Sequence, residues 1–124
     1  MIGDPALYFE GDVARLDLGE AWWRATGLPF VFAFWAGPAG VVSRAQVRRL
    51  LEAKAVGLDA VPRIAASYNG LGHGRSAFNE TYLRSHVVYD LGEGEQEGLR
   101  EFFRRAKALD LIPNVPELRF YADL

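Results

Sequence analysis

The chain has 124 residues, of which 50% are hydrophobic and 24% are charged, and its formal net charge is −2. This length and composition are typical of one globular domain and exclude a disordered chain. With no cysteine and only two histidines, the sequence excludes disulfides and thiol catalysis, and we expect no metal site and no cofactor. No block of Lys and Arg stands out, so we expect neither nucleic acid nor a membrane as a partner.

The opening residues, MIGDPALYFEGD, carry three acidic side chains and no basic one before Arg15. A secretory signal begins with a basic region followed by an apolar one, and this segment has neither. We therefore expect a cytoplasmic protein, and the lack of cysteine fits a reducing compartment.

Residues 1–2 are typical of a strand end, and a tight turn follows at Gly3. Asp4 is predicted as the N-cap of a short helix, with Pro5 as its first residue, because proline lacks the N–H that is unpaired there. The helix is predicted to end before Gly11.

A second helix is predicted over residues 17–26, with Gly27 in the left-handed position after its end. The next nine residues, LPFVFAFWA (28–36), form an apolar run that is far shorter than the roughly 20 residues of a membrane span. The run is predicted to be a buried strand ended by Gly37.

The aromatic residues of this run have two readings. For Phe30 and Phe32 a place in the core is favoured. For Trp35 the alternatives remain open: it packs in the core, or it lines a ligand cleft.

A capping box of Ser43 and Gln46 predicts a helix that runs to about Ala55 and is broken by Gly57. The capping box explains why a serine stands at position 43, and the alternative is that Ser43 contacts a ligand. A further helix is predicted from Asp59, as its N-cap, to about residue 68.

A glycine-rich loop at residues 69–74 is not a phosphate loop, because no Lys-Ser/Thr pair follows it. Asn69, His73 and Arg75 are therefore expected to be solvated. A helix over 76–84 and a strand-like segment, HVVYDLG, come next.

The clearest helix is predicted over residues 93–111. Its apolar residues recur with a period of 3.6, acidic residues occupy its first turn and basic ones its end. A last strand, ELRFY, is predicted at 117–121. The chain therefore reads as mixed α and β, helix-rich, with few strands. An apolar strand such as 30–36 is normally covered on both faces of a sheet, so we expect the chain to be part of something larger.

Three segments resemble the MqnA/MqnD family of menaquinone biosynthesis (the futalosine pathway), and more closely its chorismate dehydratase (MqnA) branch. They are IGDPAL, LDLGEAWWRATGLPFVFAFWA (16–36), and YDLGEGEQEGLREFF with ALDLIP. The resemblance implies an α/β fold, of which this chain is the C-terminal portion: a two-lobed periplasmic-binding-protein type II-like fold, helix-rich with few strands. Residues 1–27 are then the end of the second lobe, residues 28–36 the hinge-crossing strand, and residues 37–124 the C-terminal part of the first lobe.

The resemblance also implies an activity: a hydro-lyase that eliminates water from chorismate to give 3-[(1-carboxyvinyl)oxy]benzoate. The catalytic residues are unknown and are expected in a missing N-terminal half, so this chain alone is expected to be inactive. Two alternatives stay open: a non-catalytic small-anion-binding domain of the same fold, or an associating fragment without activity.

The implied ligand is a small, chorismate-like anion. Its candidate contacts are the turn and helix start at Gly3, Asp4 and Ala6, and the indole of Trp35. The alternative for Asp4 is a purely capping role. The expected protein partner is a second copy or the missing half of the family fold.

Overall fold

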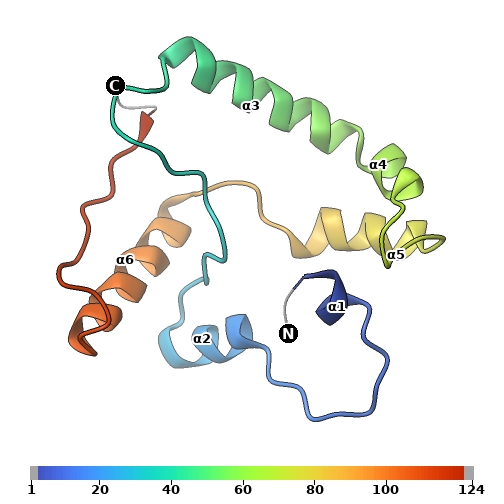
Figure 1. The fold of residues 1–124 in the computed structure, drawn as a ribbon, viewed down its shortest axis with the longest axis horizontal. Helices are drawn as coiled ribbons and strands as arrows, with labels where there is room; N and C mark the ends of the chain where they lie inside the picture. The colour runs from blue at the N-terminus through green and yellow to red at the C-terminus, as the bar shows by residue number, and fades with distance from the viewer. Residues whose placement is uncertain (1–2, 122–124) are drawn as a thin grey trace. The chain divides into compact units, whose positions relative to one another are not determined.

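A computed structural model describes residues 3–121 of the chain (Figure 1). The strand end predicted at residues 1–2 lies outside the described residues. The chain divides into two compact units: unit 1 consists of Met1–Val13 and Ala45–Tyr89, and unit 2 of Ala14–Arg44 and Asp90–Leu124. No helix in the described part is long and apolar enough to cross a bilayer.

The described residues are helix-rich, as predicted, but none of them lies in a β-strand. The helices are α1 (Asp4–Leu7), α2 (Leu18–Thr26), α3 (Arg44–Asp59), α4 (Val61–Ser67), α5 (Ser76–Thr81), the π-helix η1 (Tyr82–His86) and α6 (Glu93–Ala108).

The predicted strands at 28–36, at HVVYDLG and at 117–121 are therefore wrong for this structure. A strand requires a neighbour that pairs with its backbone, and in residues 3–121 these segments have none. The two-lobed fold and the lobe boundaries, with residues 28–36 as the segment that crosses between the lobes, remain a prediction from the resemblance.

The ends of α2 confirm the local signals in the sequence. The Asp17 carboxylate accepts a hydrogen bond from the Glu20 amide at 2.8 Å, which is the N-cap interaction. Gly27 has φ 70° and ends the helix in the left-handed conformation.

α6 stops three residues before its predicted end. Asp110 has a φ of 54°, and the Leu111 amide donates to the Ala106 carbonyl at 2.9 Å. Together with the bond from the Asp110 amide to Lys107, this is the Schellman arrangement that closes a helix.

Aromatic rings form the centre of unit 2. The ring centroid of Trp22 lies 5.7 Å from that of Phe30 and 6.0 Å from that of Phe102, and all three pairs among these residues meet edge to face. Phe32 also meets Phe30 edge to face, with ring centroids 4.9 Å apart. Such pairs contribute about 0.5–1.5 kcal/mol each beyond the area they bury. They hold the start of the apolar run against α2 and α6.

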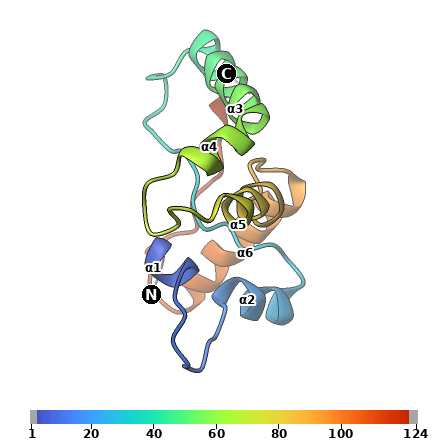
Figure 2. The same ribbon diagram turned by 90° about the vertical axis from the view of Figure 1, so that its right-hand side faces the viewer.

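In unit 1, α4 and α5 pack side by side, as both views show (Figures 1 and 2). Val61 and Ala65 are buried between them, and so is Asn79. The predicted break at Gly57 is wrong, because one glycine costs a helix only about 1 kcal/mol and α3 continues to Asp59.

Candidate functional site

The first helix begins one residue earlier than predicted. Gly3 is the N-cap with φ 68°, Asp4 is the first helical residue, and the cap makes no side-chain hydrogen bond. The prediction of Asp4 as N-cap is therefore wrong. Positive φ suits a glycine, so the turn is made by Gly3 and the Asp4 carboxylate is left for another partner.

That partner is Tyr68, whose hydroxyl donates a hydrogen bond to the Asp4 carboxylate. The bond stabilises the protonated phenol and raises the pKa of Tyr68 from 10.0 to about 12. The two residues are 64 positions apart in the chain, so no local pattern pairs them.

The amides at the start of α1 already have an acceptor. The Ala6 and Leu7 amides donate to the Gly3 carbonyl at 2.9 and 3.0 Å. A substrate carboxylate at this turn would have to replace that carbonyl as their acceptor. Binding by Gly3, Asp4 and Ala6 stays a prediction.

Asn79 holds the loop beside this turn. It is 4% exposed, its amide nitrogen donates to the Gly72 carbonyl at 2.9 Å and to the Ala65 carbonyl at 3.4 Å, and its oxygen accepts from the Tyr8 hydroxyl at 2.7 Å. A buried amide with partners on both ends is a satisfied polar group that fixes its surroundings. It ties α1's neighbour Tyr8 to α4 and to the loop.

Arg75 is exposed, as the sequence indicates, but its guanidinium has partners in unit 1. It forms an ion pair with Glu10, and its guanidinium carbon lies 5.9 Å from the centre of the Tyr8 ring. Burial, with the Asp4 charge second, raises the pKa of Tyr8. The turn therefore combines phenols and a guanidinium, which are donors suited to a small polar anion, with the Asp4 carboxylate, whose charge opposes anion binding.

Sequence reasoning did not single out Tyr8, Tyr68 or Asn79. Their partners lie 71, 64 and 7–71 residues away along the chain. Only the folding of unit 1 places these groups together.

Trp35 belongs to unit 2 and is 87% exposed, so the core alternative does not describe it. Phe32 is 70% exposed, so the core prediction is wrong for Phe32, whereas Phe30 is half-buried. A ligand contact by Trp35 stays a prediction.

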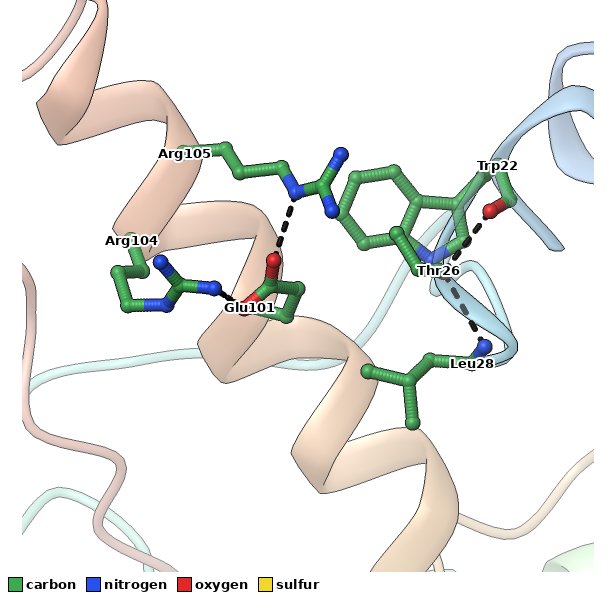
Figure 3. Close-up of polar contacts among 6 residues, drawn as sticks. All are labelled: Trp22, Thr26, Leu28, Glu101, Arg104 and Arg105. Carbon is green, nitrogen blue, oxygen red and sulfur yellow. Dashed lines mark hydrogen bonds and ion pairs between the residues drawn. The ribbon is translucent and has the colours of Figure 1, made fainter. Parts of the chain in front are cut away.

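Unit 2 also carries an ion-pair group on α6 (Figure 3). The Arg105 Nε donates to Glu101 at 2.6 Å, Arg104 pairs with the same carboxylate, and the Arg105 guanidinium carbon lies 5.3 Å from the centre of the Trp22 ring. Hydrogen bonds from Arg105, then Arg104, lower the pKa of Glu101. These three charged residues, together with Ala108 and Leu109, line an open surface hollow of about 440 Å³.

Figure 3 also shows how α2 leads into the apolar run. The Thr26 hydroxyl donates to the Trp22 carbonyl at 2.8 Å and accepts from the Leu28 amide at 3.1 Å. This fixes the direction in which the chain leaves the helix.

Nowhere in residues 3–121 do three or more His, Asp or Glu side chains gather as they would around a metal ion.

Comparison with protein families identifies the class. The model of the family described as menaquinone biosynthesis matches residues 1–108. The chain belongs to this menaquinone biosynthesis family, which confirms the resemblance found in the sequence. No curated protein and no solved structure matches the chain significantly.

Proposed function

We propose that this chain is the C-terminal portion of a chorismate dehydratase-like lyase of the cytoplasm. It would act in the futalosine route of menaquinone biosynthesis. The observation that carries the proposal is the family match over residues 1–108. The segment LDLGEAWWRATGLPFVFAFWA favours the chorismate dehydratase branch within that family.

The proposed reaction is an elimination without redox change. One ring C–H bond breaks and its proton goes to a base, the ring hydroxyl leaves with a proton as water, and the ring becomes aromatic. The product is 3-[(1-carboxyvinyl)oxy]benzoate. Aromaticity drives the step, so the protein has to orient two carboxylates and assist proton transfer.

We assign binding, not catalysis, to the turn at Gly3, Asp4 and Ala6. A Cβ built on Gly3 would meet nothing within 4 Å, so the backbone there is open to a ligand. The backbone would contact a substrate carboxylate, while the Asp4 side chain, held by Tyr68, adds a negative charge that limits affinity. Trp35 is a separate proposal, as a ring contact in unit 2.

The chain alone is proposed to bind without turnover, because the resemblance places the side chains that act on the ring outside this sequence. The alternative is a non-catalytic domain that binds small anions. Its support is the turn in unit 1, where the donors Tyr8, Tyr68 and Arg75 gather, with Asn79, Asp4 and Glu10 as their present acceptors.

Calorimetric titration separates these readings. The lyase proposal predicts that chorismate and its dehydrated product bind more tightly than succinate, which has two carboxylates and no ring. Equal binding of all three would favour the anion-binding domain, and no binding would favour a fragment without activity. A chorismate assay of the same sample should show no turnover, and turnover above background would contradict the expected inactivity.

Asp4→Asn tests the place of binding. Removing one charge about 4 Å from a bound carboxylate changes the free energy by about 1 kcal/mol in water, so we expect chorismate to bind about fivefold more tightly. Asp12→Asn removes the same charge from an exposed position of unit 1 and should leave binding unchanged. Equal effects of the two substitutions would contradict the assignment to this turn.

A further inference from the structure

The side chain of Tyr8, which directly follows α1, lies among groups of α5 and of the glycine-rich loop before it. Its hydroxyl donates to the Asn79 oxygen at 2.7 Å, and its ring centroid lies 5.7 Å from that of Phe78. The guanidinium carbon of Arg75 lies 5.9 Å from the centre of the same ring. We name these three residues, together with Gly72, the Tyr8 socket.

Gly72 leaves the room that the phenol occupies. It is buried, and a Cβ built on it would overlap the hydroxyl oxygen and the Cζ of Tyr8 and lie 2.7 Å from the Asn79 Oδ1. Gly72 does not have a positive φ, so an alanine could adopt its backbone conformation. The socket therefore needs glycine at position 72 for space and not for conformation.

The candidate binding turn depends on an anchor because α1 is too short to keep its shape alone. The helix has four residues, and isolated helices shorter than about 12–15 residues are only marginal in water. The Ala6 and Leu7 amides that close the turn on the Gly3 carbonyl belong to this helix. Tertiary contacts of the segment therefore decide how often the turn is formed.

Two other pairs tie the same segment to unit 1. Glu10 and Arg75 form an ion pair with side chains that are 72% and 44% exposed, and exposed ion pairs contribute little to stability. The hydrogen bond between Tyr68 and Asp4 joins two half-buried residues. Of the three contacts, only that of Tyr8 has a buried partner, which would be left with an unpaired oxygen if the phenol moved away.

We propose that Tyr8 anchors the Gly3 turn in the Tyr8 socket, and that Tyr8 and Gly72 are positioning residues for ligand binding at that turn. Neither residue touches the ligand; both keep the backbone that does so in its folded shape. This positioning role rests on the proposed function, which places a substrate carboxylate at the turn. If loss of the anchor leaves the turn formed in a fraction of the molecules, the apparent dissociation constant rises by the reciprocal of that fraction.

Gly72→Ala tests the socket while it leaves every polar group of the chain in place. The added Cβ overlaps the end of a side chain and not backbone, so we expect the phenol to move and the loop to stay. The amides of Ala6, Leu7 and Tyr8 should then exchange hydrogen about tenfold faster, and the dissociation constant for chorismate, measured by calorimetry, should rise about tenfold. Gly57→Ala is the matched control in the same unit, because a Cβ there meets nothing within 4 Å, and it should change neither quantity in this way.

Tyr8→Ala separates positioning from a general effect on the loop. It should raise both quantities as Gly72→Ala does, and the double variant should differ from Tyr8→Ala by less than about twofold, because the phenol is already gone. Circular dichroism checks that each variant keeps its helix content. Where a variant loses helix, Tyr8→Phe replaces it: removal of the hydroxyl alone should speed the same exchange about threefold.

Unchanged amide exchange in Gly72→Ala, or effects of the two substitutions that multiply in the double variant, would overturn the proposal. Faster exchange with an unchanged dissociation constant would overturn the positioning role. If the unsubstituted chain does not bind chorismate, the proposed function fails and the positioning role fails with it, whereas the exchange rates still decide whether Tyr8 anchors the turn.

Discussion

The contact between α6 and the start of the apolar run depends on the absence of one side chain. Gly98 is buried on α6, and a Cβ added there would lie 2.1 Å from the backbone oxygen of Pro29. Backbone cannot give way as a flexible side chain can. Gly94 lies one turn earlier, and a Cβ there would be 3.8 Å from Pro29 Cγ, which is ordinary contact.

The same substitution at the two glycines therefore has two different outcomes. Alanine in place of glycine in a helix gains up to about 1 kcal/mol of stability. At Gly98 this gain is opposed by overpacking, which costs about 1–3 kcal/mol. We expect Gly94→Ala to stabilise unit 2 slightly, and Gly98→Ala to be less stable than Gly94→Ala by about 1–3 kcal/mol. The difference measures the contact with Pro29, because helix propensity enters both variants.

Urea unfolding followed by circular dichroism and tryptophan fluorescence measures both variants under one condition. Trp22 reports on unit 2 because its ring packs on Phe30 and Phe102. Equal free energies of unfolding for the two variants would refute the close approach of α6 to Pro29. If the free energy of unfolding falls with urea concentration at the same slope in both variants, the two unfolding reactions are comparable.

The remaining predictions concern the turn in unit 1 and the aromatic run. Tyr68 should ionise at about pH 12 in an ultraviolet titration, two units above its ordinary value, and Tyr68→Phe should remove that late step. Because its pKa is raised in the folded state, the bond to Asp4 stabilises the protein below pH 10 and is lost as the pH rises through 12; ionisation of all tyrosines together near 10 would contradict this. Asn79→Ala should cost about 2–4 kcal/mol, because it leaves the Gly72 carbonyl and the Tyr8 hydroxyl without a partner. Asn69→Ala, at an exposed position, should change stability by less than about 0.5 kcal/mol, and equal losses in urea unfolding would contradict the role of Asn79. Trp35→Phe should change the free energy of unfolding by less than about 0.5 kcal/mol, since Trp35 is 87% exposed. It should weaken chorismate binding if the indole contacts the substrate ring. A large loss of stability would contradict the exposed position and show that Trp35 packs in the core.

Short-range patterns explain why the helices could be predicted. The cap of α2 at Asp17, its end at Gly27 and the period of α6 all depend on residues within one or two turns of each other. The errors at Asp4 and Gly57 arose where two local signals competed. Gly3 tolerates the positive φ that the turn needs, and the propensity of the rest of α3 outweighs one glycine.

The candidate site in unit 1 was only half predictable. Gly3, Asp4 and Ala6 stand together in the sequence, so a pattern could single them out. Tyr68, the partner of Asp4, and Asn79, the partner of Tyr8, come from distant elements, and a phenol or an amide in a helical segment carries no local sign of its partner. Without an alignment, no signal in this single sequence would have found them.

The sequence by itself determined the helix-rich character, the local ends of α2 and the membership in the menaquinone biosynthesis family, because each depends on residue order alone. Only the tertiary structure decided that the Asp4 carboxylate accepts from Tyr68, that Gly98 lets Pro29 approach α6, and that residues 30–36 have no paired backbone. The physical reason is the same in each case. Strand pairing and side-chain hydrogen bonds join residues far apart in the chain, so their formation depends on which surfaces folding brings together.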